Sequence, residues 1–180
     1  MKKTTFWREA SRYGALLGGV EVLFALFKTL LANQTWLAML LSLVSLWCTI
    51  TLLYRFTKRR AMLYGAEEGY SYGDGVKFML SLSLFSGVVL GAYEIFARNI
   101  LFVKLYRDAL NLQLLALKQN PMLSQQMPLA EVKEMAEMIM FSPIWVVITS
   151  IFGLMLSYLF YSLFIAAFTR REANIFTSQE

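Results

Sequence analysis

Residues 144–168 read IWVVITSIFGLMLSYLFYSLFIAAF and contain no charged side chain. A helix of this length rises about 37 Å, which exceeds the ~30 Å thickness of the hydrocarbon core of a bilayer. Three other stretches are long and apolar enough to cross a bilayer as helices, at 13–32, 36–56 and 76–102. The sequence therefore predicts an all-α membrane protein with four transmembrane helices.

The composition of the whole chain agrees with this fold class. Of its 180 residues, 58% are hydrophobic and 16% are charged, whereas a soluble domain carries roughly a quarter charged residues. The charges gather between the apolar stretches, which is the pattern of a chain that alternates between lipid and water. The net charge of +5 comes from basic residues beside apolar stretches, so membrane topology explains it better than nucleic acid does.

Several kinds of chemistry are excluded by the residue types that are missing or isolated. The chain has no His, and its single Cys, Cys48, lies inside an apolar stretch. These facts exclude disulfides within the chain, His-based zinc sites, Ser-His-Asp triads and Cys-His pairs. We therefore expect no catalytic residue, no metal site and no cofactor, and we do not expect an enzyme.

The distribution of basic residues predicts the orientation. They gather before the first span, between the second and third spans, and after the fourth, whereas the opposite side has a short polar loop and a longer segment with balanced charges. Loops rich in Lys and Arg stay in the cytoplasm, so both termini are expected there. The basic residues are Lys2, Lys3, Arg8, Arg12, Arg55, Lys58, Arg59, Arg60, Lys77, Arg170 and Arg171.

The segment between the third and fourth spans is expected to form helices on the outer side. Polar residues at helical spacing predict that the third helix continues past the membrane surface over 103–119, and that Asn120 and Pro121 then end it. A second amphipathic helix is expected over 129–141, lying flat on the bilayer or across the bundle. The whole chain is predicted to form one integral membrane domain.

Several short motifs are shared with a known family. They are FWREA at residues 6–10, YG at 13–14, GG at 18–19, GYSYGDGVKF at 69–78 and IAAFTRR at 165–171. Together they resemble the four-span membrane proteins of domain-of-unknown-function family 4199, over nearly the whole chain. The resemblance implies a protein of the bacterial inner membrane, and it implies no catalytic residues.

Charged residues inside the predicted spans are the candidate functional residues. An Asp, Lys or Arg at the centre of a membrane helix costs about 2.5–3.5 kcal/mol, and it usually faces the bundle interior or water. Counted along the helices, Lys28 lies roughly 22 Å into the first span and Glu94 roughly 27 Å into the third. We therefore predict that Lys28 pairs with Glu94, and that Glu94 also binds Arg98 one helical turn later. This group is either an outward-facing substrate site or an ion pair that fixes helix register.

Glu21 lies roughly 12 Å into the first span and has no obvious partner at its own depth in the sequence. Three interpretations stay open: a protonated carboxyl, a carboxyl hydrogen-bonded to a hydroxyl, or part of a proton or lipid-headgroup site. The candidate hydroxyls are those of Ser45, Thr49, Ser83 and Ser86.

Small residues recur at four-residue spacing on three of the spans. Such ridges let membrane helices approach closely, either within one chain or in a homodimer. Packing within the chain is the preferred interpretation. The residues are Gly14, Gly18, Ser83, Gly87, Gly91, Gly153 and Ser157.

Two functions are consistent with this sequence. The first is a non-enzymatic accessory or structural subunit of a membrane assembly, with a membrane-protein partner or a homo-oligomeric state. The second is a small transporter or a translocator of lipid-linked substrates, which would use the charges inside the membrane. Whether Glu21 lines an accessible cavity or is sealed between helices distinguishes the two, because a sealed Glu21 argues against transport.

Overall fold

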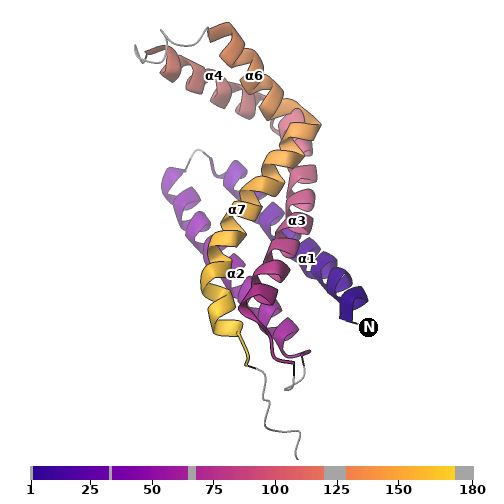
Figure 1. The fold of residues 1–180 in the computed structure, drawn as a ribbon. Helices are drawn as coiled ribbons and strands as arrows, with labels where there is room; N and C mark the ends of the chain where they lie inside the picture. Colours follow the sequence, from indigo (N-terminus) through magenta and orange to yellow (C-terminus); the bar gives the residue numbers. More distant parts are fainter. Residues whose placement is uncertain (1, 33, 65–67, 120–128, 173–180) are drawn as a thin grey trace, which may run out of the picture. The chain divides into compact units, whose positions relative to one another are not determined.

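The computed structural model describes residues 2–32, 34–64, 68–119 and 129–172, and this part of the chain is helical and contains no strand. The predicted all-α class is therefore confirmed (Figure 1). The helices are α1 (Lys2–Leu30), α2 (Thr35–Ala61), α3 (Tyr72–Phe96), the π-helical turn η1 (Ala97–Leu101), α4 (Val103–Gln119), α6 (Leu129–Phe141) and α7 (Pro143–Thr169).

Four helical stretches are long and apolar enough to cross a membrane, as predicted. They are Thr5–Leu30, Thr35–Ala61, Tyr72–Leu101 and Pro143–Thr169. The helices extend beyond the predicted spans, most of all at the start of α1, which begins at Lys2 rather than near Tyr13. The reason is physical: backbone hydrogen bonds continue through basic residues that the apolar pattern leaves out.

The chain divides into two compact units. Unit 1 comprises Met1–Leu90 and Ile151–Glu180, and unit 2 comprises Gly91–Ser150. The prediction of one integral membrane domain stays a prediction, and each unit is described by itself.

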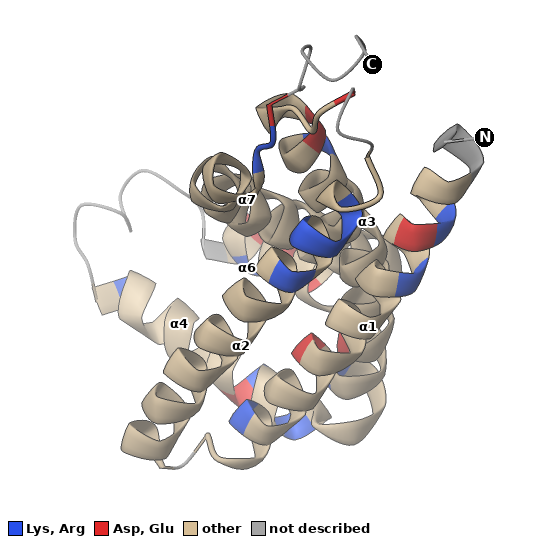
Figure 2. Ribbon diagram, turned by 90° about the horizontal axis from the view of Figure 1, so that it is seen from below, with Lys and Arg blue, Asp and Glu red and all other residues tan. Residues whose placement is uncertain are grey.

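Unit 1 is a bundle of α1, α2 and the adjoining parts of α3 and α7. Its core contains Leu17, Leu53, Phe78, Leu82 and Tyr158, all fully buried. The rings of Tyr13 and Phe56 stack with centroids 4.5 Å apart and join α1 to α2. Basic residues lie at the amino-terminal end of α1 and the carboxyl-terminal end of α2 (Figure 2).

Glycines on α1 and α3 lie where neighbouring helices come very close, as packing within the chain requires. A Cβ atom on Gly14 would lie 2.7 Å from Phe85 Cβ, and one on Gly18 would lie 2.7 Å from Val89 Cβ. A Cβ on Gly87 would lie 2.6 Å from the Cα atom of Ile151. The backbones of α1 and α7 therefore touch α3 where only hydrogen occupies the glycine side-chain position.

Gly153 makes no such contact within the described chain. No atom of the described chain lies within 4 Å of the position that its Cβ would take. Its partner in the predicted ridge, Ser157, donates a hydrogen bond to the Gly153 carbonyl at 2.9 Å. Four-residue spacing identifies a common helix face, but it does not say whether that face meets another helix.

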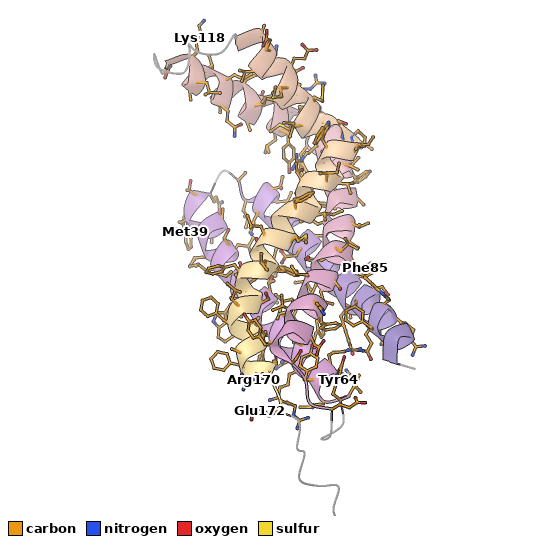
Figure 3. All side chains as sticks on the ribbon, in the orientation of Figure 1. Met39, Tyr64, Phe85, Lys118, Arg170 and Glu172 are labelled. Atoms are coloured by element: carbon orange, nitrogen blue, oxygen red, sulfur yellow. The ribbon has the colours of Figure 1, made fainter. Side chains whose placement is uncertain are left out.

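The loop after α2 is tied to the segment after α7. The Tyr70 N–H donates to the Arg171 carbonyl at 2.8 Å, and the Arg171 N–H donates to the Tyr70 carbonyl at 2.9 Å. Next to this bridge, Ser71 caps α3: its hydroxyl accepts from the Asp74 N–H at 3.1 Å and donates to the Asp74 carboxylate at 2.6 Å. This reciprocal pair satisfies a backbone N–H at the start of α3, as a helix cap does. Tyr64, Arg170 and Glu172 lie at the same end of unit 1 (Figure 3).

In unit 2 the third helix does not continue directly into the outer segment, as the sequence had suggested. The helix widens into η1, and Phe102 (φ −126°, ψ 32°) separates this turn from α4. α4 packs against α6, and their bounds match the predicted 103–119 and 129–141. The predicted break at Asn120 and Pro121 lies outside the described residues.

Candidate functional site

Glu21 and Lys28 project from one face of α1. They are seven residues apart, which is about two helical turns, so their side chains follow one another along the helix. Both side chains are half-buried. They are the two charged residues of α1 after Arg12.

A pocket of about 200 Å³ brings these two charges together with hydroxyl groups. It is open at the surface of unit 1 rather than enclosed, and eight of its ten lining residues carry a charge or a hydroxyl. α1, α2 and α7 all contribute. The lining residues are Glu21, Lys28, Ser42, Ser45, Leu46, Thr49, Leu154, Ser157, Tyr158 and Tyr161.

Glu21 has a hydrogen-bond partner on α2. The Thr49 hydroxyl donates to Glu21 Oε1 at 2.7 Å, so Thr49 is the partner among the four candidate hydroxyls. Ser45 also lines the pocket. Ser83 and Ser86 bond elsewhere: Ser83 donates to the Leu80 carbonyl at 2.7 Å, and Ser86 lies 3.4 Å from the Tyr158 hydroxyl.

Lys28 faces the pocket without a direct counter-ion in its own unit. Within the described part of unit 1, no carboxylate oxygen lies within 4 Å of its ammonium group. The predicted partner, Glu94, belongs to unit 2, so the Lys28–Glu94 pair stays a prediction. A charge swap tests it, because a swapped protein less stable than either single variant would contradict the pairing.

Unit 2 contains the predicted link between Glu94 and Arg98. Arg98 Nε donates to Glu94 Oε2 at 2.9 Å, and the Tyr106 hydroxyl lies 3.4 Å from the same oxygen. Arg98 also donates to the Met140 carbonyl at 3.3 Å, which joins η1 to α6. The Glu94 carboxylate is therefore held by groups of its own unit.

An ion pair in unit 1 that the sequence pattern did not predict joins α1 to α2. Arg60 on α2 is 4% exposed, forms an ion pair with Glu9 of α1, and lies 5.3 Å from the centroid of the Phe6 ring and 5.8 Å from that of Phe78. In the sequence, Arg60 is one of several basic residues that follow the second span. The available signal was Glu9, the only acid among the basic residues at the start of α1.

Burial also affects a phenol beside this ion pair. Tyr70 is 1% exposed. Burial raises the pKa of its hydroxyl, and nearby Tyr64 raises it further. The phenol is therefore neutral at physiological pH, and Arg60 has Glu9 as its charged partner in this region.

Sequence comparison assigns the chain to a family. The model of the family described as "Protein of unknown function (DUF4199)" matches residues 12–171. The chain belongs to this family. Comparisons with curated proteins and with solved structures find no match. The DUF4199 match includes the whole of the pocket and Arg60, whereas Glu9 lies just before it.

In this DUF4199 protein, replacing Thr49 by valine tests the bond that holds Glu21. Valine preserves the shape of the side chain but removes the donor to the half-buried Glu21 carboxyl, and a typical intramolecular hydrogen bond contributes about 0.5–1.5 kcal/mol to stability. We expect a lower thermal unfolding midpoint in detergent, measured by fluorescence-detected gel filtration. Ser42→Ala is the control, since Ser42 donates only to the Ala38 carbonyl of its own helix. Equal midpoints for the two variants would contradict this role of Thr49.

Proposed function

We propose that this DUF4199 protein is a non-enzymatic, multi-pass protein of the bacterial inner membrane that binds a small polar substrate between its helices, as a small transporter or a translocator of lipid-linked substrates does. The open pocket around Glu21 is the observation that carries the proposal. It changes the order of the two functions given by the sequence, because a Glu21 sealed between helices would have argued against transport.

The chemistry of the pocket supports binding rather than packing alone. Charges inside a membrane bundle that serve only packing are expected to pair with each other, but Glu21 and Lys28 share a pocket and form no ion pair with each other in the described structure. Thr49 occupies only one oxygen of the Glu21 carboxylate. The other oxygen and the Lys28 ammonium are available to a ligand.

Cysteine labelling tests whether the pocket is reached from water. In a Cys48→Ser background, we expect Ser157→Cys to react with a charged, membrane-impermeant thiol reagent, because Ser157 lines the pocket. Leu156→Cys is the matched control: it is the neighbouring residue, 72% exposed, on an apolar surface that lipid would cover. The proposal fails if Ser157→Cys reacts no faster than Leu156→Cys.

The proposed location and orientation rest on the basic residues and are tested separately. With both termini in the cytoplasm, a green fluorescent protein fused after Glu180 is expected to fluoresce in bacteria. An alkaline phosphatase fused at the same point is expected to be inactive, since that enzyme requires the periplasm to form its disulfides. The reverse result would invert the orientation.

A role as an accessory subunit is a second candidate, supported by a different surface. A groove of about 570 Å³ runs along α2 and is lined mainly by apolar residues, including Leu43, Val44 and Trp47. Trp47 is 77% exposed, so a helix of a membrane partner could pack over it. Stoichiometric co-purification of a membrane protein that is lost in Trp47→Ala would favour this role, whereas a lone monomer in mild detergent would argue against it.

A further inference from the structure

The charges of the pocket indicate the class of its ligand. We propose that the pocket holds a small zwitterion, with the amine of the ligand at Glu21 and its phosphate or carboxylate at Lys28. This inference rests on the proposed binding function of the same pocket and deepens it by naming the ligand chemistry. The headgroup of phosphatidylethanolamine and a free amino-phosphate or amino acid share this chemistry.

The placement of the two charges fits such a ligand. Glu21 and Lys28 lie seven residues apart on α1, about 10 Å of helix rise, and both line the pocket. They form no ion pair with each other in the described structure. A ligand that lies between them therefore meets a carboxylate on one side and an ammonium on the other, which favours a molecule that carries both a cation and an anion.

The polarity and size of the pocket also fit. Thr49 donates to Glu21 Oε1, and Lys28 supplies up to three donors for an anionic group. Hydroxyls of Ser45 and Ser157 line the space beside them. The volume of about 200 Å³ is below the roughly 300–1,000 Å³ of pockets that enclose drug-sized ligands. This is room for a headgroup rather than for acyl chains, and the open side of the pocket would leave those chains in the bilayer.

The inference is tested by ligand selectivity of the full chain in detergent. The probes are phosphatidylethanolamine, anionic phosphatidylglycerol and free phosphoethanolamine, with binding measured by native mass spectrometry and by thermal stabilisation. We expect the wild type to prefer phosphatidylethanolamine over phosphatidylglycerol. Glu21→Gln should lose this preference, with phosphatidylethanolamine binding weakened roughly ten- to a hundred-fold, as expected for a lost charge-assisted hydrogen bond. Lys28→Met should weaken binding of both lipids.

Matched controls separate the pocket from general charge effects. Glu134→Gln and Lys104→Met make the same changes at exposed positions of unit 2, and they should leave the preference intact. Stabilisation by free phosphoethanolamine alone would identify a free zwitterion as the ligand, and stabilisation by the lipid alone would identify a headgroup; either result supports the inference.

Different experimental results would overturn this inference and the proposed function. A wild type that binds phosphatidylglycerol through Lys28, with Glu21→Gln silent, would overturn the zwitterion and leave a pocket that binds an anion. A wild type that binds none of the three probes, together with an unreactive Ser157→Cys, would overturn both.

Discussion

Replacing Gly87 by alanine is expected to destabilise unit 1 strongly. The added Cβ would lie 2.6 Å from the Cα and 2.9 Å from Cγ1 of Ile151 on α7. The Cα atom belongs to backbone and cannot rotate away, so the two helices must separate. Overpacking of this kind costs about 1–3 kcal/mol, and occasionally more. The expected result is a clearly lower thermal midpoint and less monodisperse protein on gel filtration.

The chain contains its own controls for this experiment. Gly153→Ala and Gly19→Ala add the same methyl group where no described atom lies within 4 Å. Both should leave stability unchanged or raise it slightly, because alanine is favoured over glycine in helices by about 1 kcal/mol. If Gly87→Ala unfolds at the same temperature as Gly153→Ala, then α3 and α7 do not approach as closely as the structure describes.

Replacing Arg60 by methionine is expected to cost on the order of 3 kcal/mol, the lower end of the range for breaking a buried ion pair. Methionine fills much of the same volume but leaves the Glu9 carboxylate, which is 20% exposed, without its partner. The contacts of the guanidinium with the rings of Phe6 and Phe78 are lost as well. The thermal midpoint of the purified protein measures the effect, and exposed Arg59→Met is the control, with little change expected.

A double variant distinguishes the ion pair from simple packing. Combining Glu9→Gln with Arg60→Met removes both charges, and replacing a buried ion pair by neutral groups is often close to neutral. The double variant should therefore recover much of the stability that Arg60→Met loses. If the double variant instead loses as much stability as the two single variants added together, Arg60 acts through its contacts with the rings alone.

The parts of the fold that were predictable are those that follow from long stretches of sequence. Four spans and two further helices follow from apolar length and helical periodicity, because every backbone group inside a membrane must be hydrogen-bonded within its own helix. The end of α3 was not predictable in this way. The sequence of η1, ARNIL, contains neither Pro nor Gly, and a π-turn there depends on contacts such as that of Arg98 with the Met140 carbonyl.

The candidate site was predictable in part for a similar reason. Glu21 and Lys28 stand out because charges inside an apolar stretch are costly, whatever the fold. To identify Thr49 as the partner among four hydroxyls, one must know how α2 is rotated about its axis, and the sequence does not give this rotation. The role of Arg60 was not predicted, because the positive-inside rule treats all basic residues alike. The rule does not show which of them is buried against a neighbouring helix.

The order of α1, α2 and α7 along the chain determines when the pocket can form during synthesis. α1 and α2 leave the ribosome long before α7, so Glu21 and Lys28 enter the bilayer before the last wall of their pocket exists. The Thr49–Glu21 hydrogen bond joins the first two helices, and it can therefore form as soon as this hairpin inserts. Glu21 can then have a hydrogen-bond partner from the insertion of α2 onward, whereas the pocket is complete only when α7 has been inserted.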